Sequence, residues 1–332
     1  MERVDNHAEI RDFLASRRAR ITPGQAGLPA YGGNRRVKGL RREEVALLAG
    51  VSIDYFVRME RGNLAGVSDR VLEGVANALQ LDDAEREHLR SLAQAAGPTT
   101  SRRPRQAPAA VRPVIQQVLD AMTDAPAWVR NARHDIIAMN LMGRALYSPV
   151  LQSAAAGAAS RRPANTTRFI YLDPAARDFF IDFDRIATDA AAMLRLEAGR
   201  HPHDKDLITL VGELSTQSEL FSQHWASQNV TFHRSGRKRL RHPAVGELDL
   251  NFEAMELPSD PALQLNIYTA DPDTPTADGL KILATWAATR SAESATINAR
   301  SAASDPDPWL VGDWSWSLGF ASSLGPDSGV RV

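Results

Sequence analysis

The chain has 332 residues, with 39 lysines and arginines, 40 aspartates and glutamates and no cysteine. This length predicts about two domains, and 43% hydrophobic with 24% charged residues is typical of a globular chain. The lack of cysteine excludes disulfides and thiolate metal sites and fits a reducing compartment. No apolar run approaches the roughly 18 residues of a membrane span. The first residues, MERVDNHAEIRDFLASRR, lack the apolar core of a secretory signal, so we expect a soluble, cytoplasmic protein.

Charge is distributed unevenly along the chain. Residues 1–105 hold 18 basic and 14 acidic side chains, whereas residues 106–332 hold 21 basic and 26 acidic ones. The stretch GPTTSRRPRQAP lies at this boundary, so we expect domains at residues 7–96 and 111–288 with a linker at 97–110. Residues 17–42 carry eight basic side chains and no acid. Such a run is most often a solvated surface, with nucleic-acid binding as the alternative.

Two short helical patterns follow the basic run. In RREEVALLAG, helical spacing is shown by Val45, Ala46, Leu48 and Ala49, and Gly50 then suits the left-handed exit of a helix. Ser52 then suits the N-cap of a second helix, in which Phe56 and Met59 face inward. This arrangement is typical of a helix-turn-helix, and a plain packing hairpin is the alternative.

Three further helices complete the first domain: EIRDFLASRRARI before the pair, then SDRVLEGVANALQL and DDAEREHLRSLAQAA after it. Ser68 suits the N-cap of the first of these two later helices, and Asp82 with Glu85 forms a predicted capping box on the second. Five helices can enclose a core. We predict this core to contain Leu14, Val45, Leu48, Val51, Phe56, Met59, Val71, Leu72, Val75, Leu79, Leu89 and Leu92. The segment GLRREEVALLAGVSIDYFVRMERG resembles the helix-turn-helix of xenobiotic-response-element (Cro/C1-like) regulators.

That resemblance implies that the second helix of the pair enters the major groove of DNA. The side chains that point away from its inward face are the predicted base contacts, namely Ile53, Asp54, Val57 and Arg58. An intrahelical pair of Arg58 with Asp54 is the alternative. The predicted phosphate contacts are Arg35, Arg36, Lys38, Arg41, Arg42 and Ser52.

The second domain has a mixed pattern. VRPVIQQVLDAM predicts a helix, and PAWVRNARHDIIAMN predicts two short strands around a turn at residues 133–135. Helices are expected around FDRIATDAAAMLRLEAGR, DLITLVGELS and SELFSQHWASQ. ELDLNFEAMEL and LQLNIYTA alternate polar and apolar residues like strands of an antiparallel meander, and HRSGRKRLRH predicts a hairpin turn at Ser235 and Gly236.

With the first domain, these segments resemble the MmyB-like regulators over residues 7 to about 288. The resemblance rests on PAWVRNARHDIIAMNLMGRALY, RFIYLDPAARDFF, LRLEAGRHPHDKDLITLVGELSTQSELFSQHWASQNV and the region from HRSGRKRLRH to ILATWA. It implies a multi-domain protein, in which an all-α five-helix helix-turn-helix domain precedes an α/β PAS-like domain with an antiparallel sheet. It also implies a sensor of a small apolar ligand, with a fatty acid as the ligand class that the resemblance suggests.

Six residues are candidates for the ligand pocket. Trp128, Phe221 and Trp225 are large enough to line a wall, although plain core packing is the alternative for each. A ligand carboxylate would need a cationic or donor group, for which Arg133, His233 and His242 are the candidates.

Other functions are weaker. HPHDKD brings together histidines and aspartates, but the spacing suits a loop rather than a metal-dependent hydrolase. We expect no catalytic residue, metal or cofactor, since no nucleophile or phosphate-loop motif is present. A nucleoid-coating protein would need a strongly basic chain. A second domain that only dimerises or docks a protein is the main alternative to a sensor.

Two further expectations concern assembly and the tail. A single helix-turn-helix reads few base pairs, which favours a homodimer on double-stranded DNA. Residues 289–332, rich in Ser, Gly, Asp and Pro, are expected to be mostly disordered.

Overall fold

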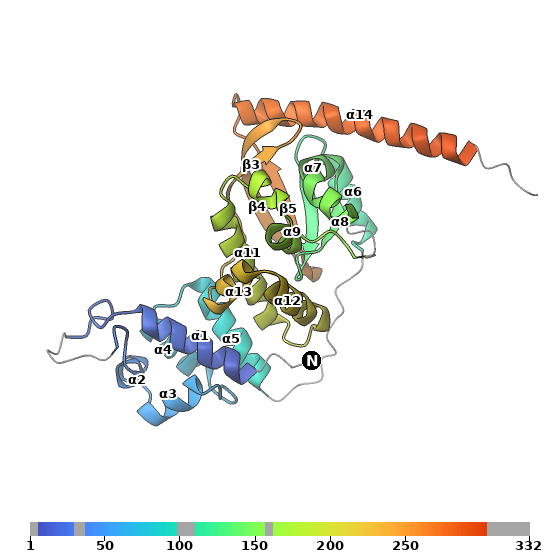
Figure 1. The fold of residues 1–332 in the computed structure, drawn as a ribbon. Helices are drawn as coiled ribbons and strands as arrows, with labels where there is room; N and C mark the ends of the chain where they lie inside the picture. Colours follow the sequence, from blue (N-terminus) through green and yellow to red (C-terminus); the bar gives the residue numbers. More distant parts are fainter. Residues whose placement is uncertain (1–5, 30–36, 98–109, 157–161, 304–332) are drawn as a thin grey trace, which may run out of the picture. The chain divides into compact units, whose positions relative to one another are not determined.

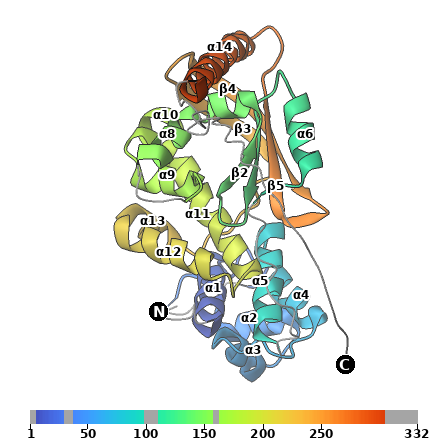
Figure 2. The same cartoon turned by 90° about the vertical axis from the view of Figure 1, so that its right-hand side faces the viewer.

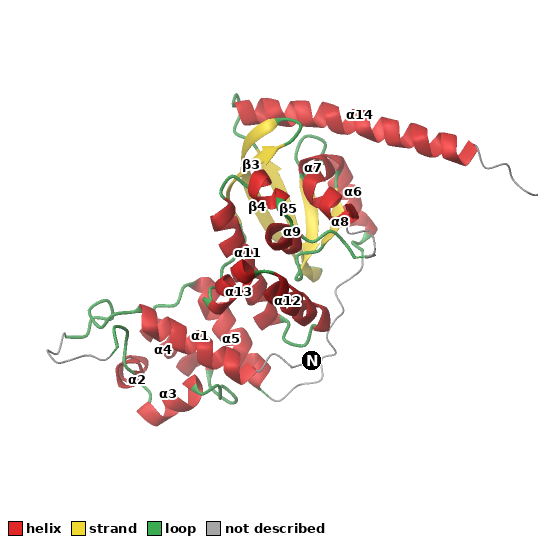
Figure 3. Cartoon of the chain, viewed as in Figure 1, coloured by secondary structure: helices red, strands yellow, loops and turns green. Residues whose placement is uncertain are grey.

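The computed structural model describes residues 6–29, 37–97, 110–156 and 162–303 (Figure 1). Met1–Ala288 forms one compact unit and Thr289–Val332 a second. Within the first unit, the described residues up to 97 contain helices and loops and no strand, and we call them the N-terminal domain (Figure 3). Its five helices are α1 (Asn6–Arg20), α2 (Arg42–Ala49), α3 (Ile53–Glu60), α4 (Asp69–Ala78) and α5 (Asp83–Ala96).

Local sequence signals set the ends of these helices. Gly50 ends α2 with φ of 66°, a left-handed conformation that glycine adopts without strain. Ser52 caps α3 by accepting a hydrogen bond from the backbone N of Tyr55 at 3.2 Å. The predicted capping box on α5 is present, since Asp82 and Glu85 bond each other's backbone N–H groups. Ser68 precedes α4 as expected, but its side chain makes no capping hydrogen bond.

The core of the N-terminal domain contains the residues predicted for it, with one correction. Phe56, Met59 and Val75 are fully buried, and Val51 and Val71 pack at the margin. Leu48 was expected inside but is 38% exposed, because Val45 and Ala46 already occupy the inward face of α2.

The C-terminal domain begins with α6, and its described residues form a five-stranded antiparallel sheet of order β2-β1-β5-β4-β3. This confirms the expected α/β class with an antiparallel sheet. The strands are β1 (Ala127–Asn131), β2 (Ile136–Met139), β3 (Ser235–His242), β4 (Gly246–Leu257) and β5 (Asp260–Thr269). The helices are α6 (Pro113–Ala121), α7 (Leu141–Leu146), α8 (Ser148–Ala156), α9 (Thr166–Leu172), α10 (Ala175–Phe179), α11 (Phe183–Arg200), α12 (Lys205–Gln217), α13 (Glu219–Ala226) and α14 (Pro275–Ala303).

The two faces of the sheet are covered differently. Helix α6 lies on one face, where Ala127 and Val129 pack with Leu119 (Figure 2). Helices α7 to α11 lie against the other, inner face, together with the first turns of α14. Because side chains alternate along a strand, β1 turns Trp128 and Arg130 toward this inner face.

One expectation for the second half of the chain was wrong. Ser235 and Gly236 belong to β3 and pair with Glu253 and Phe252, and the turn to β4 follows at residues 243–245. The glycine favours close packing, because a Cβ there would come within 3.1 Å of the Phe252 ring. In the predicted tail, residues 289–303 continue helix α14, while residues 304–332 lie outside the described part of the chain, so disorder of the tail as a whole stays a prediction.

A seam joins the two domains inside the first unit. Leu196 of α11 and Val230 complete the core of the N-terminal domain. Arg195 donates to the backbone oxygen of Trp225 in the last turn of α13, and Arg17 of α1 donates to that of Gln228, just beyond the end of this helix.

Candidate DNA-binding surface and ligand site

The outward face of α3 carries the four predicted base contacts. Ile53 is 51% exposed, Asp54 and Arg58 are exposed, and Val57 is half-buried. The Arg58 guanidinium lies 5.0 Å from the centre of the Tyr55 ring. Since no ion pair joins Arg58 to Asp54 among the described residues, the aromatic contact replaces the intrahelical pair that was the alternative.

The predicted phosphate contacts at the start of α2 are partly tied to the protein. Arg42 forms an ion pair with the buried Glu60, which also accepts from Arg18 Nε at 2.7 Å. Arg41 pairs with Glu43 at 3.2 Å, and about half of each arginine side chain is exposed. Glu60 therefore fixes the end of α3 against α1 and α2.

Four further phosphate contacts were predicted, at positions 35, 36, 38 and 52. Ser52 and Lys38 are exposed. Arg35 and Arg36 lie outside the described residues.

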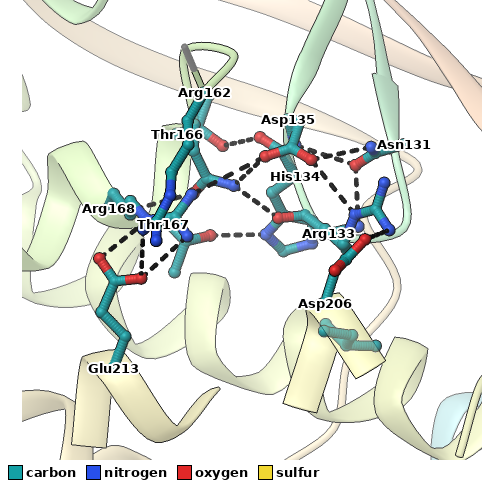
Figure 4. Close-up of polar contacts among 12 residues, drawn as sticks. Asn131, Arg133, His134, Asp135, Arg162, Thr166, Thr167, Arg168, Asp206 and Glu213 are labelled. Carbon is teal, nitrogen blue, oxygen red and sulfur yellow. Dashed lines mark hydrogen bonds and ion pairs between the residues drawn. The ribbon is translucent and has the colours of Figure 1, made fainter. Parts of the chain in front are cut away.

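Arg133 was a candidate for binding a ligand carboxylate, but acidic side chains of the protein already pair with its guanidinium. Its guanidinium contacts Asp206 at 3.0 Å, Asp135 at 3.3 Å and Asp204 at 3.4 Å (Figure 4). The same network continues through Asp135 to Asn165, whose side-chain nitrogen donates at 2.7 Å. This cluster anchors the β1–β2 turn to neighbouring helices.

The HPHDKD motif takes part in this structural network. Asp204 caps α12 by accepting from the backbone N of Asp206 and Leu207, and His201 pairs with Glu197 at 3.6 Å. Among the residues that the structure describes, no group of three metal-ligating side chains occurs.

The remaining pocket candidates are spread over three places. Phe221 and Trp225 stack with ring centres 5.5 Å apart, in a cluster between α11 and α12 that is separate from the sheet. His242 is buried with both ring nitrogens satisfied, one by the Ala145 oxygen at 3.0 Å and one by the Ala244 N–H at 3.2 Å. His242 therefore has a structural role.

The inner face of the sheet brings Trp128 and His233 toward cationic side chains that sequence reasoning missed. Arg130 and Lys238 are only 6% and 8% exposed. Arg130 Nε donates to Gln264 at 2.7 Å, and Lys238 Nζ lies 3.4 Å from the Tyr268 hydroxyl. The period-two alternation of the AWVRN strand was the signal available, since it places Arg130 on the same face as Trp128.

Neither buried cation has a carboxylate within ion-pair distance among the described residues. Glu197 and Asp189 are near enough to act on Arg130 and Lys238 only through longer-range charge. Burial lowers the pKa of Arg130. Burial, with the charges of Arg130 and Lys238 nearby, also lowers the pKa values of His134 and His233 far below the usual histidine range. Buried charges in proteins are normally paired, so Arg130 and Lys238 lack the directly contacting anion that such groups usually have.

Other polar atoms of the same inner region also lack partners. Trp128 Nε1, His134 Nε2 and Asn266 Oδ1 are buried and have no hydrogen-bond partner within the described part of the chain. His134 Nδ1 is satisfied by the Thr167 hydroxyl at 2.6 Å (Figure 4). Buried polar atoms usually have hydrogen-bond partners. These three atoms are therefore compatible with a bound molecule that supplies the missing partners.

A cleft of about 360 Å³ opens beside Arg130. This volume lies within the range typical of small-molecule sites. Its walls come from α5, α11, the segment before β3 and the strands β4 and β5, and include His233. His233 also stacks on Phe252 with ring centres 4.3 Å apart.

These features define a two-domain regulator, with a helix-turn-helix that exposes its second helix and a separate sheet domain suited to a small ligand. Residues 111–283 match the model of the MmyB-like transcription regulator ligand binding domain, and residues 9–89 match that of a helix-turn-helix domain. The chain belongs to the MmyB-like transcription regulators. Both families are regulatory rather than enzymatic. No curated protein shows significant similarity to the chain, and none of its described helices could cross a membrane.

Proposed function

We propose that this cytoplasmic regulator senses a small molecule with an apolar body and an anionic group, as in a fatty acid. The observation that carries the proposal is the pair of buried cations, Arg130 and Lys238, without a carboxylate partner beside an aromatic core. An isolated buried charge costs several kcal/mol, and a ligand carboxylate would offset that cost. The apolar body would lie along the inner sheet face near Trp128 and Phe252.

Laurate and dodecanol test the anionic group, because they share a chain and differ in charge. In isothermal titration, laurate should bind the wild type more tightly than dodecanol. Arg130→Gln should weaken laurate about tenfold or more, as expected for a lost hydrogen bond to a charged group. Arg133→Gln is the matched control, since Arg133 is already paired with acids and should leave laurate affinity unchanged. Equal affinities for the two probes in the wild type would contradict the proposal.

The natural ligand is best identified by native mass spectrometry of the protein purified from its own cytosol, followed by denaturing release. The expected result is the release of a carboxylic acid with an apolar body. A clean apo mass together with no laurate binding would favour the alternative in which this domain only dimerises or docks a protein.

For DNA, we infer that α3 enters the major groove with Ile53, Asp54, Val57 and Arg58 toward the bases. The exposure of these residues supports that role. Ser52, Arg41, Arg42 and Lys38, with Arg35 and Arg36, would contact phosphates. A homodimer with half-sites about 34 Å apart would give useful affinity. Light scattering that shows only monomers, with and without DNA, would contradict the dimer.

A further inference from the structure

The 360 Å³ cleft has one wall from the DNA-binding domain. Glu87 of α5 lines it together with residues of α11 and the sheet. A molecule in this cleft therefore touches both domains of the first compact unit.

Arg200, at the end of α11, links the two walls. Its Nε lies 2.7 Å from Glu87 Oε1, and its Nη1 lies 3.0 Å from Glu197 and 3.2 Å from Glu256. Glu87 is the member of this group that belongs to the other domain, and its side chain is 37% exposed. If Glu87 left Arg200, its carboxylate could return to water.

The charges of the cleft are unevenly paired: Arg200 contacts three carboxylates, whereas Arg130 has none within ion-pair distance among the described residues. The cleft lining has four glutamates, at positions 87, 197, 253 and 256, against three arginines, at 130, 200 and 234. An entering anion adds a fifth negative charge in a partly buried space, where repulsion is stronger than in water. Movement of Glu87 away from the cleft relieves this repulsion. Glu87 lies on α5 of the other domain, whereas the other three glutamates belong to the ligand-binding domain that forms the rest of the cleft. Moving Glu87 therefore costs less free energy than moving any of those three.

The same helix α11 also carries the closest packing of the seam. Gly199 faces the buried His88 of α5 so tightly that a Cβ at this position would lie 2.5 Å from His88 Nδ1. Arg195 pairs with Glu9 of α1. A change at Arg200 therefore acts on the turn of α11 that holds α5.

We propose that the anionic group of the ligand competes with Glu87 for the arginines of this cleft, so that ligand binding loosens α5 from α11 and alters the presentation of the helix-turn-helix. The competition rests on the anionic ligand proposed above. By linkage, the factor by which ligand binding weakens the Glu87–Arg200 pair equals the factor by which the formed pair weakens ligand binding.

Hydrogen–deuterium exchange of α5, with laurate as the probe, tests this competition. Laurate should speed exchange of residues 83–96 in the wild type and leave exchange of the sheet unchanged. Glu87→Gln should show the faster α5 exchange without laurate, gain no further increase with it, and bind laurate about fivefold more tightly, a typical allosteric factor. Unchanged sheet exchange in this variant shows that the fold is intact.

Glu256→Gln is the matched control. It removes the same charge from the same cleft and from Arg200, but from the ligand-binding domain. Its α5 exchange should therefore still respond to laurate. If laurate binds the wild type and α5 exchange does not change, the competition is wrong and the ligand class stands. If laurate binds neither the wild type nor Glu87→Gln, the ligand class fails, and the competition fails with it.

Discussion

Arg58 combines exposure with a preset orientation, because its guanidinium lies 5.0 Å from the Tyr55 ring on the same helix. Such a contact limits the freedom of a long side chain before DNA binds. Arg58→Ala should cost about 1–3 kcal/mol on a preferred site and relax preference at one base position. Lys38→Ala should weaken binding to all sequences and reduce the salt slope by about 1. Competition binding on a randomised DNA pool measures both. Uniform losses for both variants would remove Arg58 from base reading.

Residue exposure on a recognised helix could be predicted from sequence, but ion pairing across the fold could not. Arg130 and Arg133 lie three residues apart, and both are arginines in a strand-turn-strand segment. Only the three-dimensional contacts show that acids from α12 neutralise Arg133 while Arg130 stays without one. Which of the two arginines is paired thus depends on Asp204 and Asp206, about 70 positions further along the chain.

At the scale of elements, helix α11 depends on Gly199 for its approach to α5. Gly199→Ala should displace His88 or separate the helices, with a loss of about 1–3 kcal/mol in unfolding free energy, as for other overpacked sites. Gly212→Ala is the control, since a Cβ on this glycine of α12 meets nothing within 4 Å. That change should be neutral or slightly stabilising, because alanine is the better helix former. Urea unfolding of both variants gives the comparison, and equal stabilities would show that the seam is looser than described.

Most elements could be predicted because their patterns are local. Caps, glycines and periodicity placed α2, α3 and α5, and alternation placed β4 and β5. The turn assigned to Ser235 and Gly236 was wrong because a glycine that makes room for the Phe252 ring resembles a turn glycine in sequence. The Ser-rich and Ala-rich start of the predicted tail is helical in residues 289–303, where good helix-forming residues outweigh its polar character.

For the whole molecule, stability should fall on mild acidification. Burial is the main cause that lowers the pKa values of His88, His134, His224, His233 and His242. Below about pH 6.5 the unfolded chain binds protons that the folded chain does not, so unfolding free energy decreases as pH falls. Urea midpoints at pH 7.5 and 5.5 measure this loss, and His88→Gln should make it smaller. A midpoint independent of pH would contradict the burial of these histidines.

A second loss should follow at lower pH. Burial by itself would raise the pKa of Glu9, but the neighbouring His88 and Arg195 lower it to about 2. Since the carboxylate is favoured in the folded state, its contribution is complete above about pH 4.5 and is lost as pH falls toward 2. Glu9→Gln should flatten the stability curve over this lower range only.

The contact between Arg17 and the segment after α13 limits how the two domains of this protein can be separated. Arg17 of the DNA-binding domain donates to the backbone oxygen of Gln228, so the ligand-binding domain does not satisfy this oxygen by itself. In a hybrid regulator, a foreign DNA-binding domain fused at residues 97–110 would leave that oxygen without its hydrogen bond unless the new domain supplied an equivalent arginine. The two domains are therefore not freely interchangeable. Exchange between relatives should succeed only when Arg17 and the segment around Gln228 come from the same parent protein.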